Sequence, residues 1–189
     1  SESNIIAGID WCVNNASRYN ITVISMSLGT SALYTSYCDD SYASMTSSIN
    51  SAIAANISVF AATGNNGNTT AIVSPACIQN TTAVGAVNSN DAISYNRNNV
   101  TDVLAPGVSI TSTYTTSTYT ALSGTSMASP HIAGVATLML GANPTLTVSA
   151  LKSALLASVD AKGSLTGVIS TGGRINAFKA VTAAGGTTP

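Results

Sequence analysis

The segment "LSGTSMASPHIAGVATLML", from Leu122 to Leu140, places Ser126 directly before an apolar stretch with helical spacing. A helix start offers a nucleophilic serine tight backbone turning after Gly124 and free backbone N–H groups that can meet an oxyanion. We expect Pro130 in the first turn of a helix over 126–140, where its missing N–H removes no helical hydrogen bond. On this pattern alone, Ser126 is either a nucleophile or the N-cap of a buried helix.

The segments around it alternate between helical and strand patterns. Apolar spacing and β-branched runs predict strands over 20–29, 57–67, 82–87 and 102–104, a β-hairpin over 109–121, and helices over 5–16, 41–56, 126–140, 147–158 and 174–183. Strands that are apolar on both faces and alternate with helices predict a mostly parallel sheet covered by helices on both sides. The fold class is therefore α/β with three layers, and its ligands are expected at the carboxyl ends of the strands.

Length and composition limit the number of domains and the kinds of partner that this chain can have. The chain of 189 residues suits one domain, which we place over 1–183 and follow with a flexible tail or linker over 184–189. Its net charge is -1 and its six basic residues are scattered, which argues against a nucleic-acid partner. The longest apolar run, Ile132 to Ala142, is about half of the ~20 residues that a membrane span needs.

Asparagine, serine and threonine supply most of the polarity and create several glycosylation sequons. The sequon asparagines are Asn15, Asn20, Asn56, Asn68, Asn80 and Asn99. Such sequons are typical of an exported, glycosylated protein, although a chain of this composition also generates some by chance. We therefore expect a secreted or extracellular protein.

The string "GTSMASPHIAG" resembles the serine signature of the subtilases, the subtilisin-like and proteinase-K-like serine peptidases. The strings "IIAGIDWCVNN", "ISMSLGT", "VFAATGNNG" and "DVLAPGVSI" are similar to further family segments and occur in the family's order. The resemblance covers about residues 4–181. It implies a serine endopeptidase that hydrolyses polypeptide substrates through an acyl-enzyme, without a catalytic cofactor.

Carried over residue by residue, the resemblance makes Ser126 the nucleophile and Asn65 the side-chain donor of the oxyanion hole. A carboxamide at the end of a buried strand can donate to a negative oxygen without becoming acidic. The implied substrate-binding residues are Ser27, Leu28 and Gly29, which pair with an extended peptide, and Ala62, Thr63 and Gly64, which wall the specificity pocket. None of these residues is charged, so we expect cleavage after medium or large apolar residues.

The base that would activate the serine is missing from the sequence. His131, the single histidine, lies five residues after Ser126 on the same helix and is turned ~140° away, so we interpret it as structural. The family's HGT-type and D-[ST]-G motifs, which carry the catalytic histidine and aspartate, do not occur among these residues. The resemblance therefore implies the C-terminal half of a subtilase domain, incomplete at its N-terminal side, whose partner is the N-terminal half.

Three origins of such a chain stay open. It is an enzyme cut in two whose N-terminal half stays bound, a shortened chain, or a natural fragment with an interaction or structural role. The first two keep peptide hydrolysis as the function. The intact mass of the native material separates them from the third, because two co-purifying pieces or a larger precursor argue against a non-catalytic fragment.

Of the three cysteines, one is expected to be free and two are expected to form a disulfide. Cys12 falls on the apolar stripe of its helix and is expected to be a buried free thiol. Cys38 and Cys77 lie in loop-like contexts next to strand ends, and an exported protein can join them, so we predict a disulfide.

Subtilases commonly bind calcium, which takes hard oxygen ligands. By the resemblance, Asp102 is similar to the carboxylate of one family site, with the carbonyls of Gln79 and Thr81 as co-ligands and a structural role for the ion. The alternative is that Asp102 is a turn residue satisfied by backbone N–H groups.

Overall fold

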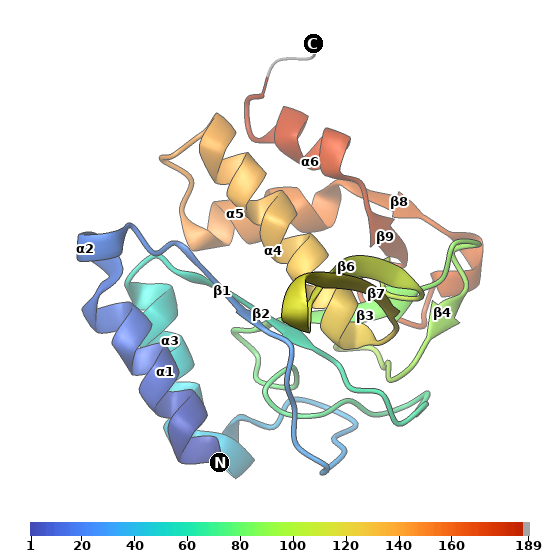
Figure 1. Cartoon of the computed structure of the whole chain (residues 1–189), viewed down its shortest axis with the longest axis horizontal. Helices are drawn as coiled ribbons and strands as arrows, with labels where there is room; N and C mark the ends of the chain where they lie inside the picture. Colours follow the sequence, from blue (N-terminus) through green and yellow to red (C-terminus); the bar gives the residue numbers. More distant parts are fainter. Residues whose placement is uncertain (187–189) are drawn as a thin grey trace.

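A central β-sheet separates two helical layers in the computed structural model, which describes residues 1–186 (Figure 1). Its main path has the order β1-β2-β3-β5-β9-β8, and β4 pairs with β3. The strands are β1 (Val23–Met26), β2 (Ser58–Ala62), β3 (Thr82–Val87), β4 (Ile93–Ser94), β5 (Val103–Pro106), β8 (Val159–Ala161) and β9 (Gly173–Ile175). All pairings are parallel except those of β4 and β8. The predicted three-layer α/β fold is confirmed.

Each face of the sheet is covered by its own helices. The helices α1 (Glu2–Asn14) and α3 (Ala43–Ala54) lie on one side, and α4 (Thr125–Ala142), α5 (Val148–Ala157) and α6 (Ala177–Ala183) lie on the other (Figure 1). The short α2 (Ala16–Tyr19) follows α1. In β2, Phe60 packs into the α4 side while Val59 and Ala61 pack into the α3 side. Burial on both faces explains why the strand sequences are continuously apolar.

The expected hairpin is present and leads directly into α4. Strands β6 (Ile110–Tyr114) and β7 (Thr118–Leu122) form a separate antiparallel pair. Short 3-10 turns occur at Asp39–Tyr42, Thr115–Ser117 and Gly163–Leu165. The N–H of Gly124 donates to the carbonyl of Gly107 at 2.7 Å, which closes the base of the hairpin segment next to the helix start.

The predicted helix over 174–183 begins too early. Arg174 and Ile175 belong to β9, where Arg174 pairs with Leu104 of β5. Asn176 starts α6 instead, because its side chain accepts a hydrogen bond from the N–H of Lys179 at 3.0 Å. The strands β4, β8 and β9 were not predicted, since two or three residues are too few to show a strand period.

The expected tail over 184–189 lies only partly within the described residues. The N–H groups of Ala184, Gly185 and Gly186 bond to carbonyls of Ala180, Thr182 and Val181, so these three residues close the end of α6. Residues 187–189 lie outside the part that the structure describes. Within residues 1–186, no helix combines the length and apolarity needed to cross a bilayer.

The cysteines form the predicted disulfide. Cys38 and Cys77 are joined, with Cα atoms 5.4 Å apart, and both are buried. Cys12 is free, as expected, but it is half-buried rather than buried. The apolar stripe of α1 is wider than the surface that the sheet and α3 cover, so Cys12 borders an open groove between α1 and β1.

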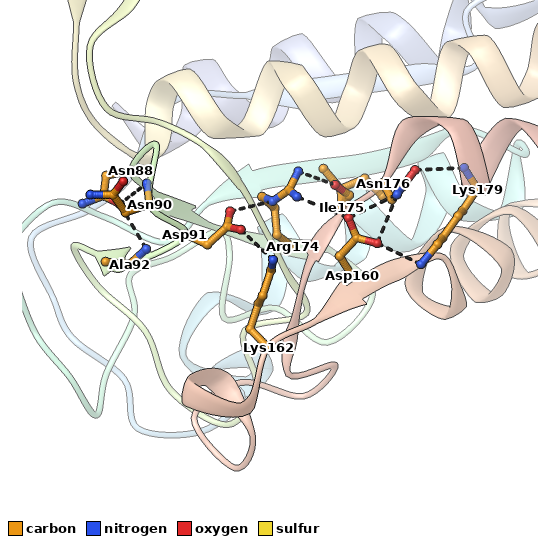
Figure 2. Close-up of polar contacts among 10 residues, drawn as sticks. All are labelled: Asn88, Asn90, Asp91, Ala92, Asp160, Lys162, Arg174, Ile175, Asn176 and Lys179. Atoms are coloured by element: carbon orange, nitrogen blue, oxygen red, sulfur yellow. Dashed lines mark hydrogen bonds and ion pairs between the residues drawn. The ribbon is translucent and has the colours of Figure 1, made fainter.

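Charged side chains gather on the turn before β4, on β8 and β9, and on α6 (Figure 2). Arg174 stands between two carboxylates, with its Nε 2.6 Å from Asp91 and its Nη2 3.2 Å from Asp160. Lys162 pairs with Asp91 at 2.7 Å, and Lys179 pairs with Asp160 at 2.8 Å. Hydrogen bonding to Lys162 holds the pKa of Asp91 below its usual value, and that to Lys179 does the same for Asp160.

We expect Asp91→Asn to lower stability at neutral pH by about 1 kcal/mol or less, the range of exposed ion pairs. Asparagine retains the left-handed backbone of position 91, where φ is 58°, but it cannot pair with Lys162 and Arg174. Since the folded-state pKa is lowered, the stabilisation is present above about pH 4 and is lost as the pH falls through the folded pKa. Thermal unfolding of both proteins across this range measures it. A difference that stays constant in acid contradicts the assignment.

Candidate active site

The carboxyl end of β1 meets the first turn of α4 through a reciprocal pair of serines. The Ser27 hydroxyl donates to the Ser126 carbonyl at 2.7 Å, and the Ser126 hydroxyl lies 3.4 Å from the Ser27 carbonyl, to which it donates. Ser27 comes directly after β1, at the sheet edge where an α/β fold binds its ligands. The structure thus brings together two residues that are 99 positions apart.

Pro130 makes this contact possible. The helix α4 begins at Thr125, so Pro130 lies in its second turn and not in the first turn as predicted. A helical residue at position 130 would donate its N–H to the Ser126 carbonyl, four residues earlier, but proline has no N–H. The Ser126 carbonyl is therefore left free, and Ser27 satisfies it.

Thr125 fixes the orientation of the Asn65 carboxamide. Asn65 Oδ1 accepts hydrogen bonds from the backbone N–H of Thr125 at 2.9 Å and from its hydroxyl at 3.0 Å. A backbone N–H can only donate, so the atom facing it is the amide oxygen, and the NH₂ group of Asn65 points the other way. Asn65 is exposed, and its NH₂ is available to a ligand.

A second donor lies beside it at the helix start. Among residues 1–186, the backbone N–H of Ser126 has no hydrogen-bond partner, and it sits at the positive end of an 18-residue helix. Gly124 precedes it with a φ of 154°, and a Cβ there would lie 3.0 Å from Asn65 Nδ2. Glycine thus allows the Asn65 amide and the helix start to approach each other.

The loop that carries Asn65 is braced by a residue that the sequence reading missed. Asn96 is fully buried, and its side-chain oxygen accepts from the N–H of Asn68 at 3.0 Å while its NH₂ donates to Asn66 at 3.2 Å. Its carbonyl accepts the hydroxyl of Thr63 at 2.7 Å. Gly64 has a φ of 103°, and a Cβ there would lie 2.7 Å from Asn96 Nδ2. No local pattern marks Asn96, because all these partners are about 30 positions away.

Beside Ser126 and Asn65 lies a small cavity of about 160 Å³. Its lining includes four of the six expected substrate-binding residues, namely Leu28, Gly29, Ala62 and Gly64. Thr63 does not line it, since its side chain is buried and bonded to Asn96. Val73 joins the lining instead. Residues 27–29 are exposed, as a segment that pairs with a peptide has to be.

The described residues offer Ser126 no base. His131 is exposed, and its Nδ1 lies 2.8 Å from the Met127 carbonyl, so this nitrogen carries the proton and donates to the helix backbone. Ser126 and His131 both border a second open cavity of about 370 Å³ between β6 and α4, yet no hydrogen bond joins them. Within residues 1–186, the hydrogen-bond acceptor of the Ser126 hydroxyl is a carbonyl and not a histidine.

Two of the three residues expected to bind calcium lie close together. Asp102 and the Thr81 carbonyl lie close to each other, because Lys152 contacts both. The described contact of Gln79 is that of its backbone N–H, which donates to Asp39 at 3.2 Å. No group of three or more histidine, cysteine, aspartate or glutamate side chains that could hold a metal occurs in residues 1–186.

We expect Thr125→Val to destabilise the folded protein by about 1–3 kcal/mol. Valine retains the shape of this fully buried side chain but leaves the Gly64 N–H, now 3.1 Å from the hydroxyl, without an acceptor. Urea unfolding measures the change, and Thr125→Ser, which retains the hydroxyl, is the matched control. Equal stability of the valine variant and the unmodified protein would contradict this account of the loop.

The sequence matches known proteins over most of its length. The family profile described as "Subtilase family" matches residues 1–175. Subtilisin DY of Bacillus licheniformis is 40% identical over 158 residues, which cover 81% of this chain and 53% of that protein. Subtilisin E of Bacillus subtilis is 43% identical over 148 residues, which cover 76% of this chain and 36% of that protein. The chain thus spans about half the length of its curated relatives, or less.

Solved structures agree as well. The prenylagaramide maturation protease PagA matches the whole chain with a TM-score of 0.84 and 26% identity, and the match covers 69% of that protein. A cold-adapted subtilisin-like serine proteinase matches 93% of the chain with a TM-score of 0.75 and 33% identity, covering 60% of that protein. From its sequence and its fold, the chain belongs to the subtilase family.

Proposed function

We propose that this chain supplies the nucleophile and the oxyanion hole of a serine endopeptidase. The observation that carries the proposal is the anchored amide of Asn65, whose oxygen is held by Thr125 so that its NH₂ is free beside Ser126. The relatives' names, which include subtilisins and an extracellular serine proteinase of Thermus, support peptide hydrolysis.

In this reaction, Ser126 Oγ attacks the carbonyl carbon of the scissile peptide bond while a base takes the hydroxyl proton. The negative oxygen of the tetrahedral intermediate accepts hydrogen bonds from Asn65 NH₂ and the Ser126 N–H, and removing one such donor lowers kcat by about 10²- to 10³-fold. The C–N bond then breaks, the amine leaves with the proton, and water hydrolyses the Ser126 ester. The peptide is held along residues 27–29.

We place the missing base in an N-terminal half of the same domain, which carries the catalytic histidine and aspartate. An open sheet edge supports this partner, since β1 pairs with β2 on one side only. Beside β1 runs an apolar groove of about 500 Å³, lined by α1 and β1 side chains that include Ile5, Cys12 and Ile24. An edge strand next to apolar side chains suits further strands of the same sheet.

A second candidate function follows from the same site. Because no described base reaches Ser126, the chain also fits a subtilase-like fragment that acts as an extracellular interaction or structural module. The two functions differ in whether the N-terminal half restores hydrolysis.

We also propose that the protein is exported. The buried Cys38–Cys77 disulfide supports an oxidising compartment. Four of the six sequon asparagines, namely Asn20, Asn56, Asn80 and Asn99, are exposed, which supports glycosylation in a host that performs it.

We expect the 189-residue chain alone to show no peptide hydrolysis and no labelling of Ser126 by a fluorophosphonate. A serine needs a base within hydrogen-bond reach, and the Ser126 hydroxyl has only a carbonyl. Adding the N-terminal half is expected to restore both signals, and Asn65→Ala is expected to lower the restored kcat by about 10²- to 10³-fold. Full activity of the chain alone would show that a base lies elsewhere in it.

Cys12 gives this experiment an independent control for binding. It is the single cysteine outside the disulfide, and it borders the groove beside β1, so its alkylation rate is expected to fall when the N-terminal half binds. Protection of Cys12 without hydrolysis favours the non-catalytic function. If the alkylation rate of Cys12 does not fall, the N-terminal half does not bind at this groove.

The cavity beside Ser126 sets the expected specificity. Its lining contains no charged residue. The lining residues follow β1, lie at the end of β2 or directly after it, or belong to the start of α4, and Val73 completes them. We therefore expect the reconstituted enzyme to cleave after medium or large apolar residues. Cleavage of a peptide library measures this, and a preference for lysine or arginine would contradict it.

A further inference from the structure

A lysine ammonium lies where calcium was expected. Lys152, on α5, places its Nζ 3.3 Å from Asp102 Oδ2 and donates a hydrogen bond to the Thr81 carbonyl at 3.2 Å. The same Asp102 oxygen accepts the N–H of Ala83 at 2.8 Å, and the N–H of Asp102 donates to the Ala83 carbonyl at 3.0 Å. Lys152 thus links α5 to the start of β5 and to the residue before β3.

This pair is shielded from solvent more than an ordinary surface ion pair. The Asp102 side chain is 15% exposed and that of Lys152 is 28% exposed. Burial raises the pKa of Asp102, against the opposing effects of the Lys152 charge and the Ala83 N–H. A carboxylate removed from water in this way needs a compensating positive charge beside it.

The oxygens do not fit a calcium ion while Lys152 is in place. Calcium takes six to eight oxygens at about 2.3–2.6 Å, and two of the three expected ligands already contact Nζ. A divalent ion on those two oxygens would lie next to the ammonium, and the two cations would repel each other in a site with little solvent.

We propose that Lys152 is the resident cation of this site and takes the structural place of a calcium ion. The ammonium neutralises Asp102 and ties Thr81, at the start of β3, to α5. Unlike a metal, it is covalently part of the chain, so a chelator cannot remove it. The link is therefore expected to be independent of calcium.

Four forms of the intact protein test this inference: the unmodified protein, Lys152→Met, Asp102→Asn and the double variant. Calorimetric titration with calcium chloride gives the number of bound ions, and thermal unfolding in chelator and in millimolar calcium gives their effect. We expect Asp102→Asn to leave the calcium stoichiometry of the unmodified protein unchanged. We expect Lys152→Met to lower Tm by several degrees in chelator, to bind one additional calcium ion and to regain part of its Tm in calcium.

The double variant is the matched control, because without either charge it is expected to gain no calcium ion. Lys152→Arg retains the charge and is expected to show no added calcium response. If Asp102→Asn removes an ion from the unmodified protein, calcium binds here beside the lysine and the inference is wrong. It is equally wrong if Lys152→Met gains no ion. If Lys152→Met fails to fold, the calcium stoichiometries of Asp102→Asn and the unmodified protein still show whether calcium binds at Asp102. Neither calorimetry nor thermal unfolding depends on peptidase activity.

Discussion

Close packing of α4 against the parallel sheet sets the geometry of everything around Ser126. Its sheet-facing residues are buried and include Ala128, Ile132 and Ala136, spaced by four along one side of the helix. Alanines on this face let the helix axis approach the strands. The helix therefore starts at the level where β1 and β2 end. There the Ser126 carbonyl accepts a hydrogen bond from Ser27, and the Thr125 N–H donates one to Asn65.

The sequence predicts the parts of the fold and site whose signals are local. Long periodic segments, the serine signature and the two loop cysteines fall into this class, and the layers and the disulfide follow them. Residues whose role comes from distant partners could not be predicted. Thr125 and Asn96 hold the Asn65 loop through contacts about 30 to 60 positions away, and nothing in their neighbours reveals this. Pro130 was misplaced because a helical turn holds only 3.6 residues, so a proline four or five residues after the helix start already lies in the second turn.

The two edge strands of the sheet, β1 and β8, have different surroundings. The β8 end has a three-residue antiparallel strand and the ion pairs of Asp91, Asp160 and Arg174, which disfavour pairing with another chain. Among residues 1–186, no ion pair lies beside β1, and the groove next to it is lined mostly by apolar side chains. This asymmetry supports the proposal that the N-terminal half pairs with β1. Cys12 lies beside this uncovered edge. Its burial was overestimated because the apolar stripe of a helix does not reveal how much of the stripe other elements cover.

The disulfide closes a covalent ring around one part of the site. Asn65, Gly64 and Val73 all lie between Cys38 and Cys77, which are 39 positions apart, whereas Ser126 lies outside this ring. Closing a loop of this size lowers the conformational entropy of the unfolded chain. In the simplest model, this stabilises the folded protein by about 4 kcal/mol. Reduction returns that entropy to the unfolded chain, so it lowers the stability of the whole fold that positions Asn65, Gly64 and Val73. The disulfide thus stabilises the folded arrangement in which Asn65 lies next to the start of α4.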